Sequence, residues 1–193
     1  MRGEKWPANA ENKILLYSLG VKKNLIKPVI FGLAAILALS ACSSDSQSQS
    51  EFSADDQMFA QMMIPHHEQA IEMSNLALAI SKDSEVLQLA EQIKSAQGPE
   101  IEQMKSWGAS GSDHAGHAMG GMLSDSEMEK LTKATGSDFD RLFLEGMIKH
   151  HEGAIEMAQM VLDSDNAEAA KLGKEIVRTQ QAEINQMQDL LNR

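Results

Sequence analysis

The chain has 193 residues, 28 of them acidic and 17 basic, and a formal net charge of −11 at pH 7. The first 41 residues hold six of the basic and two of the acidic residues, so the rest has a net charge of about −15. Such an acidic surface argues against nucleic acid and anionic lipid headgroups as partners, and it attracts cations without selecting among them.

Residues 1–41 are predicted to be a leader. Lys22, Lys23 and Lys27 precede an apolar run over 29–39 that is too short to span a bilayer as a helix. The run ends in Leu-Ser-Ala before Cys42, which resembles the lipobox of bacterial lipoproteins. We therefore expect cleavage before Cys42 and a lipid on its sulfur. An ordinary signal peptide and an uncleaved membrane anchor are the alternatives.

The codon of Val21 is a candidate translation start, because a signal peptide normally begins close to its positively charged region. Cys42 is the only cysteine, so the mature chain can form no internal disulfide. We expect an exported, membrane-anchored lipoprotein that faces the periplasm or the cell exterior. Residues 42–51 form the lipidated cysteine and a flexible, serine-rich linker, and residues 52–193 form one folded domain.

An internal repeat organises the folded domain. Residues 63–73 read MIPHHEQAIEM and residues 147–157 read MIKHHEGAIEM, with nine of eleven positions identical. The similarity continues downstream, where Ile93, Gln97, Glu100, Ile101, Gln103 and Met104 correspond to Ile176, Gln180, Glu183, Ile184, Gln186 and Met187. Each repeat is therefore two helices long, and the domain consists of two helical hairpins.

Apolar residues at alternating spacings of four and three predict the helices. In the first helix this row holds Phe59, Met63, His66, Ala70, Met73, Ala77 and Ile80. We predict helices over 54–81, 84–107, 138–163 and 166–191, and a short one to about residue 134. Because the turns at 81–84 and 163–166 are short, the four long helices are predicted to form an all-α four-helix bundle.

Local signals predict where helices begin and break. Three sequences have the pattern of a capping box: Ser53-x-x-Asp56, Ser124-x-x-Glu127 and Ser137-x-x-Asp140. Gly98-Pro99 predicts a kink or a restart in the second helix, because proline lacks an amide hydrogen and clashes with the preceding turn.

Two histidine pairs, His66-His67 and His150-His151, are the main candidate site. Adjacent helical residues point about 100° apart, and both members of a pair lie on apolar rows. We therefore expect all four to be buried and the two pairs to meet near the middle of the bundle. Buried imidazoles need partners and repel one another when charged, and a shared metal ion resolves both problems. Core histidines that only satisfy one another are the alternative.

Methionines at helical spacing flank both pairs: Met63, Met73, Met147 and Met157. Thioether sulfur suits Cu(I), and imidazole suits copper, zinc, iron and nickel. The pattern therefore favours Cu(I) and leaves Cu(II), zinc and iron open; methionines that only fill the core are the alternative. The nearby glutamates are expected on solvated faces, with one pair able to orient an imidazole: Glu68, Glu72, Glu152 and Glu156.

The loop over 109–123 is a second candidate metal contact. Within nine residues it holds His114, His117, Met119 and Met122. Glycines let the backbone wrap around an ion, so we expect a weaker site that delivers ions to the bundle. A loop with incidental histidines is the alternative.

The sequence favours a binding protein over an enzyme. No Glu-x-x-His occurs, although bundles that hold two iron ions use that motif with further inward glutamates. The chain also lacks the motifs of a nucleophilic hydrolase, a phosphate loop or a zinc protease. A metal oxidase remains the enzymatic alternative.

Two copies of Met-Ile-x-His-His-Glu-x-Ala-Ile-Glu-Met, each followed by Ile-x-x-x-Gln-x-x-Glu-Ile-x-x-Met, resemble the family called domain of unknown function 305, over about residues 55–191. Its members include CopM-like periplasmic copper-binding proteins. The resemblance implies a ferritin-like four-helix bundle and, for some members, copper tolerance. It implies ligands among the four paired histidines and their four flanking methionines.

We therefore expect a protein that sequesters copper or hands it on, with a copper donor or acceptor protein as a candidate partner. A structural or partner-binding bundle without metal is the alternative. Nothing in the sequence predicts the oligomeric state.

Overall fold

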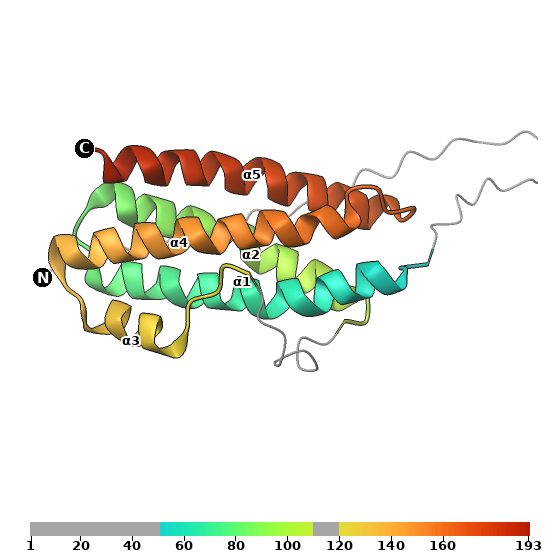
Figure 1. Cartoon of the computed structure of the whole chain (residues 1–193), viewed down its shortest axis with the longest axis horizontal. Coiled ribbons are helices and arrows are strands. Elements are labelled where there is room, and N and C mark those ends of the chain that lie inside the picture. The colour runs from blue at the N-terminus through green and yellow to red at the C-terminus, as the bar shows by residue number, and fades with distance from the viewer. Residues whose placement is uncertain (1–50, 110–119) are drawn as a thin grey trace, which may run out of the picture. The chain divides into compact units, whose positions relative to one another are not determined.

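The computed structural model describes residues 51–109 and 120–193. Four long helices dominate it: α1 (Ala54–Ile80), α2 (Ser84–Ser106), α4 (Gly136–Ala158) and α5 (Ala167–Leu191). A short helix, α3 (Asp125–Lys133), precedes α4, and a 3₁₀ turn, η1 (Gln159–Val161), extends it. The described part contains no strand, so the predicted all-α bundle is confirmed (Figure 1).

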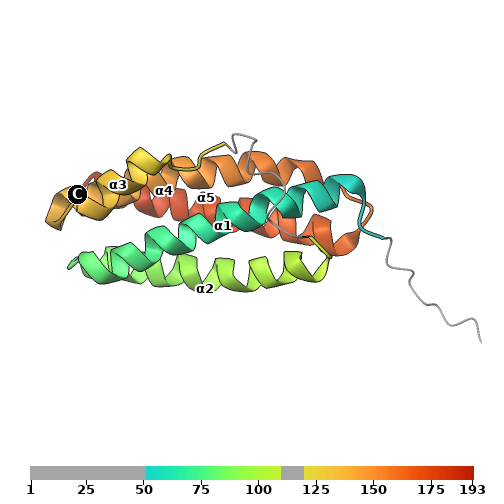
Figure 2. The ribbon, with the colours of Figure 1, turned by 90° about the horizontal axis from the view of Figure 1, so that it is seen from below.

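The long helices form two hairpins that pack against each other. α1 packs on α2, α4 packs on α5, and the α1–α4 contact is the main one between the hairpins. Figure 2 shows the two hairpins stacked, with α3 along α4. α1 and α4 run in opposite directions (Figure 1), so equivalent positions of the two repeats meet only at the centre of the α1–α4 contact and lie further apart toward either end.

Two of the three predicted capping boxes are confirmed. The Ser53 hydroxyl accepts from the Asp56 amide (3.1 Å), and the Asp56 carboxylate accepts from the Ser53 amide (2.8 Å). The box that begins at Ser124 closes in the same way. The third prediction was wrong, because α4 begins at Gly136 and its start has no side-chain cap. Asp140 instead accepts a hydrogen bond from the Ser81 hydroxyl (2.6 Å) and so ties the two hairpins together.

Of the two alternatives predicted at Gly98-Pro99, a kink or a restart, the restart does not occur, because α2 continues through Pro99 to Ser106. A proline inside a helix costs about 3 kcal/mol or more. Ile93 and Ile101, on either side of the proline, are both buried in the core. Packing of these two isoleucines in the core on both sides of Pro99 keeps α2 continuous.

The core is divided into two apolar clusters. Between them, each long helix places a pair of polar side chains at the same level, which we call the polar layer. Its members are His66, His67, Gln97, Glu100, His150, His151, Gln180 and Glu183. Along every long helix the order is therefore apolar, polar, apolar, and the polar layer crosses the whole bundle.

Several predictions concern residues outside the described ranges. These are the leader, the lipidated Cys42 and the linker up to residue 50, together with His114, His117 and Met119 of the loop. Within residues 51–109 and 120–193, no helix combines the length and the apolar character needed to cross a membrane.

Candidate metal centre

The four paired histidines are fully buried, each with 0% of its surface exposed. The rings of His66 and His150 lie against each other where α1 meets α4, tilted by 39° and with 3.7 Å between their centroids. The prediction that the pairs are buried and meet inside the bundle is confirmed. In an antiparallel contact, equivalent residues meet only at the centre, and His66 and His150 occupy that position.

His67 and His151 turn toward the second helix of their own hairpin. The Nε2 atom of His67 lies 2.8 Å from a carboxylate oxygen of Glu100 on α2. The Nε2 atom of His151 lies 2.7 Å from a carboxylate oxygen of Glu183 on α5. Since adjacent residues of a helix point about 100° apart, one histidine of each pair faces the other repeat and the second faces its own hairpin.

The glutamates that we predicted as candidate partners of the histidines were the wrong ones. All four glutamates close to the pairs in sequence are exposed: Glu68, Glu72, Glu152 and Glu156. The histidine partners Glu100 and Glu183 come from the following helices. The sequence contains a signal for these partners, because Glu100 and Glu183 occupy equivalent positions of the two repeats.

A segment that we call the strap, residues 120–123, contacts His66; it is the yellow stretch before α3 in Figure 1. The carbonyl oxygen of Gly120 lies 3.1 Å from His66 Nε2. The side-chain amide of Gln69 donates to the Leu123 carbonyl (2.9 Å) and accepts from the Leu123 amide (2.8 Å). The strap includes the candidate ligand Met122, whose side chain is half-buried.

The strap approaches α4 so closely that only glycine fits at the contact. A Cβ atom at Gly153 would lie 1.9 Å from the carbonyl oxygen of Gly120. Gly121 has φ +85°, a left-handed conformation that favours glycine. This explains why the second repeat has glycine at 153, where the first has Gln69.

Burial keeps the central imidazoles neutral. The pKa of His66 is lowered from 6.5 to about 3, first by desolvation and then by the neighbouring His67, while the Gly120 carbonyl opposes the shift. Desolvation, followed by the nearby His66 and His151, lowers the pKa of His150 well below its usual value. Neutral imidazole, which has a free lone pair, is the form that binds metal.

Thioethers border the polar layer on both sides. Met63 and Met157 belong to one apolar cluster, and Met73 and Met147 belong to the other. All four are buried. In the described part, no three His, Cys, Asp or Glu side chains converge where one ion could sit.

The polar layer has donor atoms without protein partners. Among the described residues, eleven buried side-chain nitrogen and oxygen atoms lack a hydrogen bond, and nine of these belong to the polar layer. They include the Nδ1 atom of every paired histidine and both amide atoms of Gln97 and Gln180. Because unpaired buried polar groups are costly, this concentration fits a layer built to receive an ion. Imidazole nitrogen beside thioether sulfur is a donor set that suits copper.

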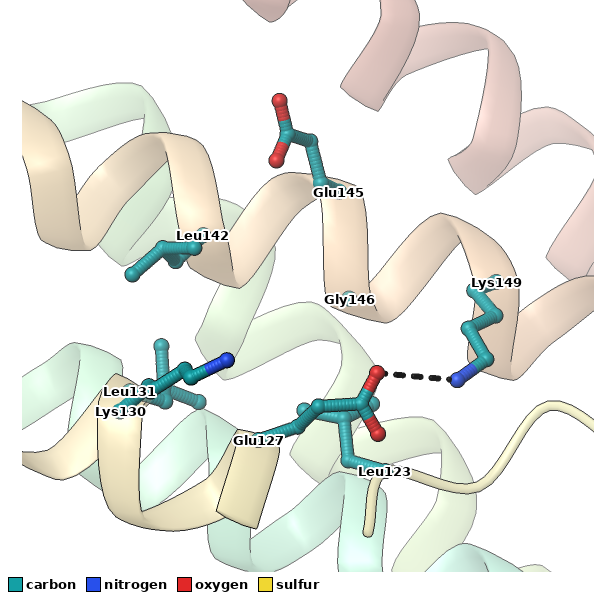
Figure 3. A pocket seen from close by; sticks show the side chains of 8 residues that line it. All are labelled: Leu123, Glu127, Lys130, Leu131, Leu142, Glu145, Gly146 and Lys149. Carbon is teal, nitrogen blue, oxygen red and sulfur yellow. Dashed lines mark hydrogen bonds and ion pairs between the residues drawn. The ribbon is translucent and has the colours of Figure 1, made fainter.

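A separate hollow of about 320 Å³ lies between α3 and α4, outside the polar layer. Figure 3 shows Leu131 and Leu142 beside it, and Glu127 on Lys149 (3.2 Å) at its edge. Its lining has no histidine, methionine or cysteine. This hollow therefore lacks the soft and imidazole donors of the polar layer.

The chain is similar to several solved structures. A protein from Deinococcus radiodurans with the domain of unknown function 305 is 33% identical, with a TM-score of 0.68, over 73% of this chain and 97% of its own. One from Streptomyces coelicolor, described as secreted, is 31% identical with a TM-score of 0.67 over 72% and 94% of the two chains. CopM in its Cu(II)-bound form is 35% identical with a TM-score of 0.61 over 70% and 94%.

CopM has also been solved with Cu(I) and with silver bound. None of the curated proteins compared with the chain matches it. The model of the domain of unknown function DUF305 matches residues 56–191, which span all four long helices except the first two residues of α1. The chain therefore belongs to the DUF305 family.

Proposed function

We propose that this protein binds copper in the polar layer, with Cu(I) as the favoured ion. The observation that supports this most directly is the unpaired Nδ1 atom on each of four fully buried histidines. Buried thioethers border these nitrogens on both sides, and sulfur ligands favour the cuprous state. The similarity to CopM, solved with Cu(II), Cu(I) and silver, supports the same assignment.

The protein's role is to sequester copper or to hand it to another protein, and so to contribute to copper tolerance. A fully buried site suits retention of an ion, and the acidic surface raises the local concentration of cations. We propose binding without turnover. Adding Fe(II) or Cu(I) to the purified protein should leave oxygen consumption at the background rate, and a rise that depends on the histidine pairs would assign an oxidase instead.

The protein is exported and held at a membrane by a lipid on Cys42. The apolar run followed by a lipobox-like sequence supports this, as does the similarity to a protein described as secreted. Cells should retain the protein in the membrane fraction and release it when Cys42 is changed to serine. A wild-type protein that is soluble after cell breakage would contradict the lipid anchor.

Copper binding is tested by anaerobic Cu(I) titration of the purified protein against a chromogenic chelator. The variant has His66, His67, His150 and His151 all changed to leucine, which keeps the core volume close to that of histidine. Circular dichroism establishes that the variant is folded. We expect Cu(I) binding in the wild type and its loss in the variant. Binding that survives would move the site to the loop of His114, His117, Met119 and Met122.

A further inference from the structure

We propose that Glu100 and Glu183 are positioning residues for the metal: each fixes the tautomer of one histidine, so that His67 and His151 bind the ion through Nδ1. This inference rests on the proposed function and deepens it by naming the ligand atoms and the residues that set their strength. It concerns two side chains that lie one helix away from the histidine motifs.

The contacts determine which ring nitrogen has the hydrogen. A carboxylate can only accept a hydrogen bond, so the Nε2 atoms of His67 and His151 must donate at 2.8 and 2.7 Å. A neutral imidazole has a single N–H group, which leaves the Nδ1 atom of each ring with a lone pair. The Gly120 carbonyl requires the same tautomer of His66, at 3.1 Å.

In the described part of the protein, these Nδ1 lone pairs have no hydrogen-bond partner. The Nδ1 atoms of His67 and His151 are buried and accept no hydrogen bond. The neutral ring with Nδ1 free is also the state in which imidazole binds metal.

The charge of the glutamates then strengthens the ligand. Their side chains are 15% and 16% exposed, so water screens them little. A carboxylate that accepts from the far nitrogen of an imidazole makes the near nitrogen a stronger donor, and losing such a partner typically lowers metal affinity about 10- to 100-fold. Each repeat has the same histidine–glutamate pair at the same level of the bundle, so the Nδ1 atom is strengthened as a donor in the same way in both halves of the site.

The test compares two double variants of the full protein. In the first, Glu100→Gln and Glu183→Gln keep an oxygen that accepts the hydrogen bond and remove the charge. In the matched control, Glu68→Gln and Glu152→Gln remove the same charge from exposed positions directly after the pairs. Anaerobic Cu(I) affinity is measured against a chromogenic chelator, and ¹⁵N NMR of the metal-free wild type reports the imidazole tautomers.

We expect Nε2–H tautomers for His67 and His151, at least a tenfold loss of Cu(I) affinity in the first variant, and affinity within threefold of the wild type in the control. Nδ1–H tautomers or doubly protonated rings at pH 7 would overturn the assignment. So would equal affinities in the wild type and the first variant, or an equal loss in the control; in these cases the proposed function stands. A wild type that binds no Cu(I) would overturn both proposals.

Discussion

Replacing Gly153 by alanine should displace the strap and destabilise the protein. The new Cβ would lie 1.9 Å from the carbonyl oxygen of Gly120 and 2.4 Å from its carbon, both backbone atoms. Real Cβ atoms do not approach backbone atoms this closely, so the strap must move. Its docking rests on the bond to His66, the two bonds to Gln69 and the burial of Leu123.

The magnitude follows from these contacts. Three hydrogen bonds contribute about 0.5–1.5 kcal/mol each, and burial of Leu123 contributes about 1.5–3 kcal/mol. Alanine gains roughly 1 kcal/mol over glycine inside a helix, which offsets part of the loss. Because the strap can shift without detaching completely, we expect a net loss of about 2–4 kcal/mol in the free energy of unfolding.

Urea unfolding followed by circular dichroism measures this loss as a lower midpoint, by on the order of 1–2 M. Gly146→Ala is the matched control on the same helix, because its Cβ would meet only side-chain ends, at 3.2 Å for Leu123 and 3.3 Å for Met73. We expect the control within about 1 kcal/mol of the wild type. A Gly153→Ala variant as stable as the wild type would refute the docking of the strap on α4.

Three further outcomes are expected from urea unfolding of the metal-free protein. Changing Gln97 and Gln180 to leucine should raise stability by about 1–3 kcal/mol per site, because it removes buried amides without partners; unchanged or lower stability would show that the amides are satisfied. The unfolded chain takes up protons near pH 6.5, whereas the pKa of folded His66 is about 3 and that of His150 is also lowered. The free energy of unfolding should therefore fall as the pH is lowered below 6.5, by up to about 1.4 kcal/mol per pH unit for each histidine. The double variant His66→Leu, His150→Leu should show a weaker dependence of this free energy on pH. An unchanged dependence would contradict the lowered pKa values of the two histidines. Asp140→Ala should cost about 1–3 kcal/mol, because the Ser81 hydroxyl loses the acceptor of its hydrogen between the hairpins and keeps only the bond that it accepts from the Asp83 amide; a variant as stable as the wild type would contradict that role.

The sequence by itself determined the helices, the repeat and the burial of the histidines. These features depend on local periodicity: apolar residues every three to four positions define one face of a helix, and a residue on that face faces the core. The helix of His66 and the helix of His150 were therefore predicted within a few residues of their observed bounds. Family membership followed from the same repeated motif.

Only the tertiary structure decided what each imidazole touches. Which helix faces a given histidine depends on how each helix is rotated and how far it is shifted along the bundle, and these follow from the packing of the whole core. Glu100 and Glu183 were thus missed as partners, although the repeat marks them as equivalent. Asp140 was wrongly assigned to a helix cap for the same reason, because a long-range contact to Ser81 outweighed a local one.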